Sequence, residues 1–282
     1  MIKKLFAFLT VLCLFLGCSK TDVQIPSYIE IDNYFTKVAH TAADSIQGTN
    51  NQKFTDVLVY ANGTTYGTYP LGSKIPVLTS GPTSFIIRGV IRVNGVDILR
   101  SDYEVMKGCD TVVTVNPGKV THVIPTFEYF SSAQFRWMDD FEPNTQTYGG
   151  VVSSYGQHPT LTANTYTPGF GGYGTCLALR PTSDTTPASV QTKATIALPA
   201  GGIGVYMEIN YLSNTTIHVL INGQDGGSIK PSGSWNKMYL TLTEQVSSLQ
   251  AGSYTIAFQA YYDPTVGANL ALIDNIKIVT SR

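Results

Sequence analysis

The segment 205–212 reads VYMEINYL and decides the fold class, because apolar and polar side chains alternate along it. A period of two is typical of a β-strand that turns one face to a protein core. The segments 217–221, 238–242 and 254–260 repeat this pattern, and Asn222-Gly223 after the first of them has the composition of a hairpin turn. Since no long segment has a period of 3.6 residues, the sequence predicts an all-β protein.

The predicted strands fall into two groups, which indicate two domains. The first group, over 28–130, has Asn62-Gly63 and Asn94-Gly95 as hairpin turns and the size of an immunoglobulin- or transthyretin-like sandwich. The second group, over 133–282, has about eight strands with long connections and fits a jelly roll. Residues 143–175 are rich in Gly, Thr, Tyr and Asn, so we expect long loops there. The predicted strands of the first group lie at 28–32, 54–60, 84–93, 96–103, 110–115 and 119–127.

The start of the chain has the pattern of a cleaved export signal. Lys3 and Lys4 precede a 12-residue apolar run that is too short to span a bilayer. The run ends in Phe15-Leu16-Gly17-Cys18, which resembles the lipobox of bacterial lipoproteins. The resemblance implies cleavage before Cys18 and acylation of its thiol and new amino group. An ordinary secretory signal with an incidental cysteine, or a buried strand, remains the alternative.

These observations predict a signal peptide over 1–17, a tether over 18–27 and a lipid anchor in the outer membrane through Cys18. Ser19-Lys20-Thr21-Asp22 partly matches the lysine and acidic residues that follow the lipidated cysteine in Bacteroidota lipoproteins exported to the cell surface. The resemblance favours the outer surface over the periplasmic face. A solvated tether has similar residues for no special reason, so the periplasmic location stays open.

Charge and cysteine content exclude several function classes. The formal net charge is −1 and no run of like charge occurs, which argues against nucleic acid and anionic membrane surfaces as partners. Only 13% of residues are charged, as expected of a turn-rich extracytoplasmic β-protein. Cys109 and Cys176 remain after Cys13 leaves with the signal and Cys18 takes the lipid. We expect them to be two buried free thiols, because a disulfide would have to join the two domains.

Several short segments resemble a known family. FTDVLVYANG at 54–63, GTYPL at 67–71 and IPVL at 75–78 look like the first domain of two-domain Bacteroidota lipoproteins. DDFE at 139–142, WNKMY at 235–239 and IDNI at 273–276 resemble the jelly roll that follows in those chains. The same motifs are similar to carbohydrate-binding modules and to MAM-like or galactose-binding-like domains. The resemblance implies location and fold but no reaction.

The resemblance also implies a possible structural calcium ion. In the similar carbohydrate-binding modules, a Phe-Glu near the first strand and an Asp near the last strand hold calcium. Here these positions are Glu142 and Asp274. Carboxylates are the hard oxygen ligands that calcium prefers, with backbone carbonyls completing the shell. The alternative is that both residues are solvated or cap turns.

Alternation also predicts a face that suits a sugar. If the apolar residues of the second domain point to the core, their neighbours share the opposite face. Aromatic rings stack on sugar C–H faces, and amides and carboxylates bind hydroxyls. The alternative is a sheet surface covered by loops or by the first domain. The predicted face consists of Tyr206, Glu208, Asn210, His218, Tyr239, Thr241, Gln259 and Tyr261.

Catalytic motifs are missing from the sequence. It has no Gly-x-Ser-x-Gly elbow, no His-Glu-x-x-His and no phosphate-binding glycine loop. Ser234-Trp235-Asn236-Lys237 matches Ser-x-x-Lys, but its flanks suggest loop and strand, and we expect Trp235 to serve packing. The sequence therefore predicts a non-enzymatic outer-membrane binding protein whose jelly roll binds a glycan or a protein. The alternative is an accessory lipoprotein subunit of an outer-membrane β-barrel complex with no sugar ligand.

Overall fold

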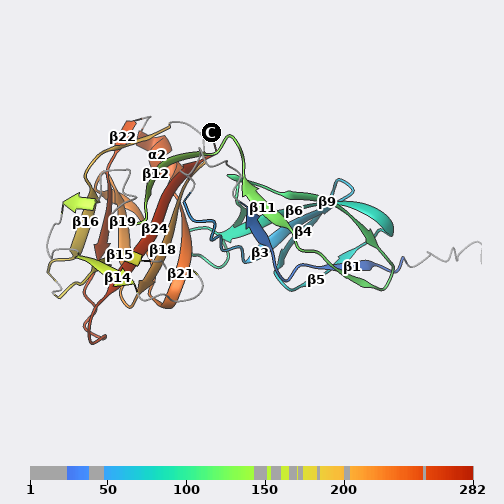
Figure 1. The fold of residues 1–282 in the computed structure, drawn as a ribbon, viewed down its shortest axis with the longest axis horizontal. Helices are drawn as coiled ribbons and strands as arrows, with labels where there is room; N and C mark the ends of the chain where they lie inside the picture. The colour runs from blue at the N-terminus through green and yellow to red at the C-terminus, as the bar shows by residue number, and fades with distance from the viewer. Residues whose placement is uncertain are drawn as a thin grey trace, which may run out of the picture.

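The computed structural model is built almost wholly of β-strands, arranged as two sandwiches that lie side by side (Figure 1). The prediction of an all-β chain with two sandwiches is confirmed. Cys18 and the rest of the predicted signal and tether up to Val23 lie outside the described residues. The structure describes residues 24–37, 48–142, 151–153, 160–164, 170, 174–182, 185–199, 204–249 and 252–281.

The first eleven strands form the N-terminal sandwich. Its largest sheet has the order β4-β3-β6-β7, and β9 pairs with the other part of β6. Two smaller sheets, β10-β1-β5 and β2-β11-β8, complete the sandwich, in which β1 and β2 pair in parallel with β10 and β11. The strands are β1 (Ser27–Glu30), β2 (Phe35–Lys37), β3 (Asp56–Ala61), β4 (Thr64–Pro70), β5 (Lys74–Val77), β6 (Gly81–Arg92), β7 (Arg100–Asp102), β8 (Met106–Lys107), β9 (Cys109–Val115), β10 (Val120–His122) and β11 (Thr126–Tyr129).

The remaining strands form the C-terminal sandwich, with two large sheets face to face. We call one the interface sheet, with the order β14-β15-β24-β18-β21 and β12 also paired to β24, and the other the distal sheet, with the order β13-β16-β23-β19-β20. A short pair, β17 and β22, lies beside them. The strands are β12 (Gln134–Asp139), β13 (Val151–Ser153), β14 (Thr160–Asn164), β15 (Gly174–Leu179), β16 (Ala188–Thr192), β17 (Ile196–Leu198), β18 (Val205–Ser213), β19 (Ile217–Ile221), β20 (Gln224–Ile229), β21 (Ser232–Thr241), β22 (Gly252–Tyr254), β23 (Ile256–Ala260) and β24 (Ala271–Thr280).

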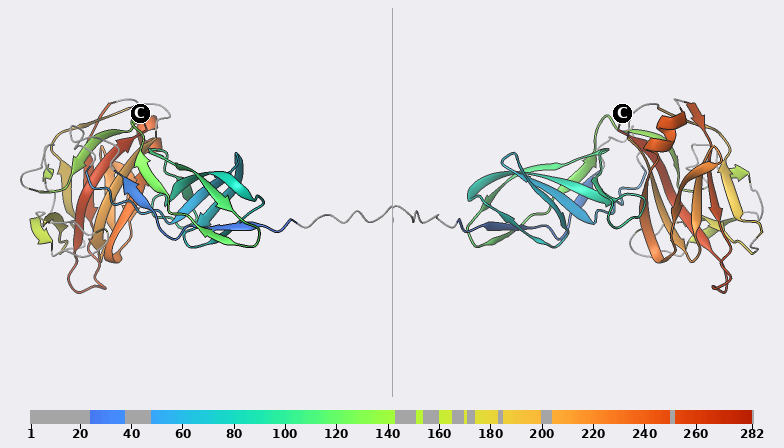
Figure 2. Two further views of the ribbon diagram at one scale, coloured as in Figure 1. Left: turned by 45° about the vertical axis from the view of Figure 1, so that its right-hand side comes forward. Right: turned by 180° about the vertical axis from the view of Figure 1, so that it is seen from behind.

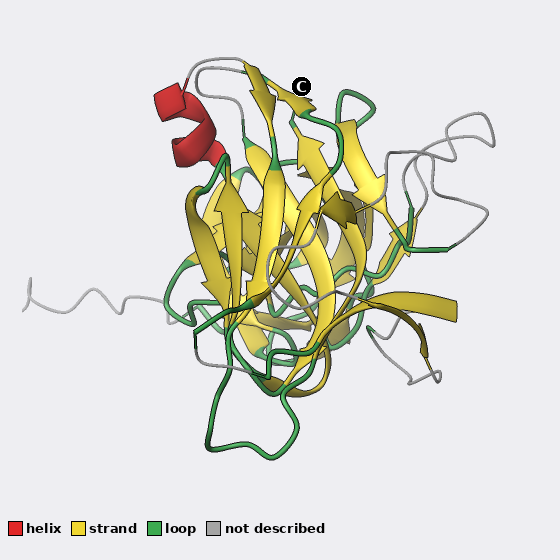
Figure 3. Cartoon of the chain, turned by 90° about the vertical axis from the view of Figure 1, so that its left-hand side faces the viewer, coloured by secondary structure: helices red, strands yellow, loops and turns green. Residues whose placement is uncertain are grey.

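Two details differ from the sequence analysis. The region 143–175, expected to be loops, contains β13 and β14 and the start of β15, and α2 (Thr243–Leu249) was not expected. Figure 3 shows this helix at one edge of the C-terminal sandwich. Strands of three to five residues and a helix of seven carry too few residues for a recognisable period.

Two of the three predicted Asn-Gly turns close hairpins as expected, whereas Asn94-Gly95 does not, because the strand expected over 96–103 begins only at Arg100. Asn62 and Gly63 join β3 to β4 with φ of 48° and 79°, and Asn222 and Gly223 join β19 to β20 with φ of 49° and 76°. Asn and Gly tolerate this left-handed backbone, which matches the twist of the flanking strands. Local turn chemistry therefore sets the register of both hairpins.

The N-terminal sandwich packs against one part of the outer face of the interface sheet, over the start of β18 and the ends of β21 and β24 (Figure 2). Tyr206, Tyr239 and Val279 of the C-terminal sandwich belong to the hydrophobic core of the N-terminal one. The backbone N–H of Asn94 donates to the carbonyl of Tyr239 at 2.8 Å, and the N–H of Thr241 donates to Asn94 Oδ1 at 2.9 Å. The contact is thus an extension of the core with backbone hydrogen bonds, and not a loose junction.

Cys109 and Cys176 form no disulfide, as predicted, although only Cys176 is buried and Cys109 is half-buried. Trp235 is buried, in agreement with a packing role. Among the described residues, no helix has the length and apolar character needed to cross a membrane.

Candidate functional site

The predicted sugar face is divided between two sheets. Alternation assigns a side to each strand, but the outward sides of the two sheets of a sandwich point in opposite directions. Figure 1 shows β18 and β21 toward the N-terminal sandwich and β19 away from it. The interface sheet carries Tyr206, Glu208, Asn210, Tyr239 and Thr241, whereas His218, Gln259 and Tyr261 lie on or directly after strands of the distal sheet.

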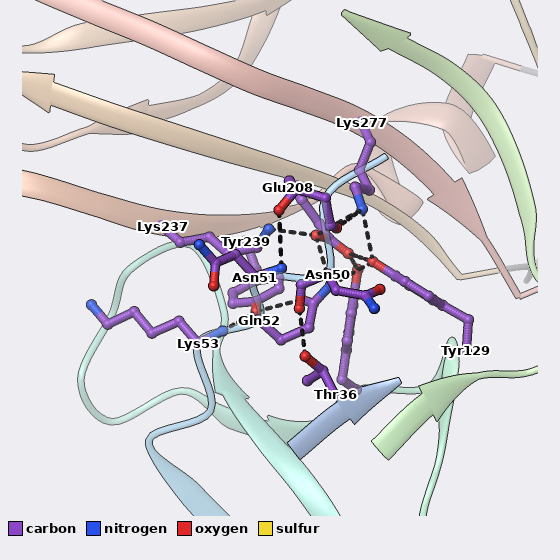
Figure 4. Close-up of polar contacts among 12 residues, drawn as sticks. Thr36, Asn50, Asn51, Gln52, Lys53, Tyr129, Glu208, Lys237, Tyr239 and Lys277 are labelled. Carbon is purple, nitrogen blue, oxygen red and sulfur yellow. Dashed lines mark hydrogen bonds and ion pairs between the residues drawn. The ribbon is translucent and has the colours of Figure 1, made fainter. Parts of the chain in front are cut away.

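Glu208 is the centre of a buried polar network between the two sandwiches (Figure 4). Its Oε1 accepts a hydrogen bond from Tyr103 OH at 2.6 Å and another from Tyr129 OH. Lys237 Nζ lies 2.7 Å from Oε2 as an ion pair without good hydrogen-bond geometry, and Lys277 Nζ lies 3.9 Å from it. The carboxylate therefore joins strands of the C-terminal sandwich to two tyrosines of the N-terminal one.

Gln52 extends this network. Its Nε2 donates to Glu208 Oε2 at 3.2 Å and to Tyr129 OH at 2.6 Å, while its Oε1 accepts from Tyr239 OH at 2.8 Å. Tyr239 OH also accepts from the backbone N–H of Lys53 at 2.7 Å. Every polar atom of the Gln52 side chain is used, as expected of a buried amide.

The neighbouring charges of the network favour the ionised form of Glu208. Burial alone would raise the pKa of Glu208, but the charges of Lys237 and Lys277, with the hydrogen bond from Tyr103, lower it to about 2. Burial lowers the pKa of Lys277 to about 8, although Glu208 opposes that shift. The Glu208 side chain has no exposed surface, so it lies inside the contact between the two sandwiches and not on an open face of the sheet.

The distal sheet presents a polar row instead. Ser189, Gln259, His218 and Ser228 lie opposite one another across β16, β23, β19 and β20. Tyr261, which follows β23 and is 42% exposed, packs edge-on against His218 with 4.8 Å between ring centroids. Its hydroxyl donates to Gln259 Oε1 at 3.1 Å. Here the structure does bring three of the predicted residues, His218, Gln259 and Tyr261, into contact.

A third arrangement lies where β12 ends beside β24. Asp139 Oδ2, Asn210 Oδ1 and Asp274 Oδ2 are buried and have no hydrogen-bond partner. Asn210 lies opposite Asp274 in the pairing of β18 with β24, and the bulge of β18 is adjacent. Three orphaned oxygens are costly in a protein interior unless something positive binds them. Glu142, predicted with Asp274, accepts a hydrogen bond from the N–H of Thr175 at 2.5 Å through Oε1, and its charge acts on Asp274.

The carboxylates in this cluster repel one another. Burial, with the charges of Asp140, Glu142 and Asp139, raises the pKa of Asp274 to about 8, although the N–H of Asn275 donates to it. Burial likewise raises the pKa of Asp139 to about 6. Among the described residues, no group of three or more His, Cys, Asp or Glu side chains forms a metal site by itself. The donors present are hard oxygens, which fit calcium only with backbone carbonyls or water completing the shell.

Sequence analysis missed most of the interface network. Gln52, Tyr103 and Tyr129 lie in the N-terminal half, and Gln52 is 156 positions from Glu208. Lys277 had one signal that would have found it, since it is a charged residue between Ile276 and Ile278. A lysine at such a position needs a buried partner.

Comparison with known proteins gives no family. No protein-family model and no curated protein matches the chain. Among solved structures, it is similar to the enzymatically active domain of bacteriophage CBA120 tailspike protein 4 (16% identity, 50% of this chain and 21% of that one, TM-score 0.37). It is also similar to a family 35 carbohydrate-binding module from an environmental isolate (18% identity, 50% and 91% covered, TM-score 0.31). A third is carbohydrate-binding module CBM36 in complex with calcium and xylotriose (12% identity, 52% and 98% covered, TM-score 0.30).

Proposed function

We propose that this protein is a non-enzymatic glycan-binding protein, and that the outer face of the distal sheet holds the glycan. The observation that carries the proposal is the contact of His218, Gln259 and Tyr261 on the sheet that the N-terminal sandwich does not cover. Tyr261 supplies an exposed ring for stacking on a sugar. Gln259 and His218 supply hydrogen-bonding groups for hydroxyls.

Glycan-array binding of the purified chain tests this function. We expect binding to a subset of glycans, with loss of that binding in Tyr261→Ala, because stacking contacts supply most of the apolar area in such sites. Tyr28→Ala, at a half-buried tyrosine of β1, is the matched control and should bind like the original chain. An array without signal, or equal binding by both variants, would remove the proposal for this face.

Membrane anchoring through Cys18 is part of the same proposal. The apolar run before it, the Leu16-Gly17-Cys18 ending and the short tether support an acylated protein of the outer membrane. Cys18→Ala should move the protein from the membrane fraction to the soluble fraction. Protease added to intact cells should digest a surface-displayed protein, whereas protection until the outer membrane is permeabilised would indicate the periplasmic face.

Calcium binding near Asp274 is a second proposal, supported by the orphaned oxygens of Asp139, Asn210 and Asp274. When bound, the ion would supply the positive charge that the cluster of carboxylates lacks. Calcium should raise the melting temperature of the full chain and chelator should lower it, because a ligand of the native state stabilises that state. Asp274→Asn should abolish the response. A melting temperature that calcium does not change would exclude the ion.

An accessory subunit of an outer-membrane β-barrel complex is the alternative function. It is favoured by apolar side chains exposed on the N-terminal sandwich, among them Phe35 (60%), Ile98 (86%) and Val112 (69%). Such side chains are common at protein contacts. Co-purification with a barrel protein from native membranes, together with an array without signal, would favour this function over glycan binding.

A further inference from the structure

A cleft between the two sandwiches is lined neither by His218, Gln259 and Tyr261 nor by the orphaned oxygens, although β20, the edge strand of the distal sheet, forms part of one wall. Its volume is about 410 Å³, within the range of small-molecule sites. The strand β6 with the loop after it forms one wall, and β20, β21 and the end of β18 form the other. Lining residues include Lys53, Arg92, Asn94, Tyr211, Lys230 and Asn236.

The walls of this cleft carry an excess of positive charge. Arg92 is paired with Asp97 at 2.5 Å, but its Nε is buried without a hydrogen-bond partner. Among the described residues, no carboxylate forms an ion pair with Lys53 or Lys230. Lys53 Nζ donates only to a neutral acceptor, Asn236 Oδ1, at 2.5 Å.

Lys53 is held in unfavourable surroundings for a cation. Burial and the nearby charge of Arg92 lower the pKa of Lys53. An anion in the cleft would reverse the second effect and compensate the first. The buried network behind the wall adds to the positive potential of the cleft, because its one carboxylate, Glu208, faces two lysines, Lys237 and Lys277. Lys237 also lines the cleft.

We propose that this cleft binds an acidic saccharide, with Lys53, Arg92 and Lys230 holding its carboxylate or sulfate group. The amides of Asn94 and Asn236 supply the neutral part of the lining, with the hydroxyl of the buried Tyr211, which accepts from Asn236 Nδ2 at 3.4 Å. Amides and a hydroxyl suit sugar hydroxyls. The volume exceeds what a single inorganic anion fills, which favours a sugar that carries the charge.

Isothermal titration of the full chain tests the site with an oligogalacturonate, a heparin-derived sulfated oligosaccharide, neutral cellotriose and inorganic sulfate. At least one of the two acidic saccharides should bind more tightly than cellotriose and sulfate, and the tighter of the two identifies the acidic group. Its affinity should fall about tenfold in Lys230→Ala, because a charge-assisted contact is lost. Lys230 is exposed, so this variant keeps the fold. Raising the salt to about 1 M, where charges are screened within about 3 Å, should weaken binding as well.

Lys119→Ala is the matched control, since it removes an equal charge from an exposed lysine between β9 and β10. It should leave the affinity unchanged, as should Tyr261→Ala, which alters only the distal sheet. Equal losses in Lys230→Ala and Lys119→Ala would reduce the effect to net charge and overturn the site. Loss in Tyr261→Ala alone would place the acidic sugar on the distal sheet and also overturn it.

Anionic lipid vesicles are the competing occupant. Val96 and Ile98 are exposed beside the cleft, and apolar side chains next to cations can insert at a membrane surface. Sedimentation with vesicles that contain phosphatidylglycerol should show no binding that depends on Lys230, because the cations line a recess. Binding to vesicles that is lost in Lys230→Ala, with no binding of either acidic saccharide, would refute the proposal.

Discussion

The interface sheet and the distal sheet have the same alternating pattern but opposite surroundings. On β18 the residues between the core positions, Tyr206 and Glu208, are buried against the N-terminal sandwich. On β19 and β23 the corresponding residues, His218 and Gln259, are only partly buried. A period of two therefore identifies which residues of a strand share a face. Whether that face can bind a ligand depends on whether another part of the chain packs over it.

The largest effect on stability is expected when the buried carboxylate of the interface sheet is removed. Glu208→Ala leaves Lys237 and Lys277 buried without their counter-ion, and we expect a loss of about 3–5 kcal/mol in the free energy of unfolding. Urea denaturation of the full chain measures it. A loss below about 1 kcal/mol would show that water replaces the network at little cost.

When calcium is absent, the free energy of unfolding should fall as the pH rises from about 4 to about 8. In the unfolded chain Asp139 and Asp274 lose their protons near pH 4, whereas the folded chain retains them until about 6 and about 8. The folded state therefore binds more protons in this window, so its advantage is complete at low pH and disappears as the pH increases. Each unit of raised pKa corresponds to about 1.4 kcal/mol, so rises of about two units at Asp139 and about four units at Asp274 set an upper bound of about 8 kcal/mol, which solvent screening at these partly buried groups reduces.

Asp274→Asn separates this effect from the rest of the chain. The variant cannot ionise at that position, so only the original chain should lose stability there as the pH rises. From about pH 5 to about pH 8, the unfolding free energy of the variant should therefore increase relative to that of the original chain. Chemical denaturation in chelator at several pH values measures the difference. A difference that does not change with pH would mean that Asp274 titrates normally.

A pair of tyrosine variants compares the two sheets directly. Tyr239→Phe removes the hydroxyl that donates to Gln52 and accepts from the N–H of Lys53, so we expect a loss of about 1–3 kcal/mol. Tyr261→Phe removes a hydroxyl whose hydrogen bond to Gln259 is exposed, and it should cost less than about 0.5 kcal/mol. Similar losses in the two variants would mean that the distal sheet is covered as the interface sheet is.

The smallest expected effect on stability is that of Gln259→Ala. A partly exposed side chain at this position contributes within about 0.5 kcal/mol of zero to unfolding. Under the proposed function, glycan binding should nevertheless weaken. Thermal melts and array binding measured on the same preparation would separate a binding role from a structural one.

Local signals in the sequence predicted what depends on neighbouring residues. Alternation located β18, β19 and β23, and Asn-Gly pairs located the turns after β3 and β19, because both depend on backbone geometry within a few residues. The partners of Glu208 could not be predicted in this way. Gln52 and Tyr103 reach it only after both sandwiches have formed, and no spacing in the sequence records that contact.

The candidate site shows the same limit in a different form. His218, Gln259 and Tyr261 were predicted as part of one face, and the structure does bring them together. Asn210 was assigned to the same face for its amide. The bulge in the pairing of β18 with β24 lies next to it, and its oxygen is buried beside Asp274, where alternation has no predictive value.

The shared core has a consequence for the order in which the two sandwiches fold during synthesis. A ribosome releases β1 to β11 first, and an N-terminal domain usually folds at that stage. Here Tyr206, Tyr239 and Val279 complete the N-terminal core, and Val279 lies in the last strand. Until β18 emerges, Tyr103 and Tyr129 lack Glu208, the carboxylate that accepts their hydrogen bonds. The N-terminal core is therefore complete only after the last strand has been synthesised, and both sandwiches reach their final packing together at that late stage.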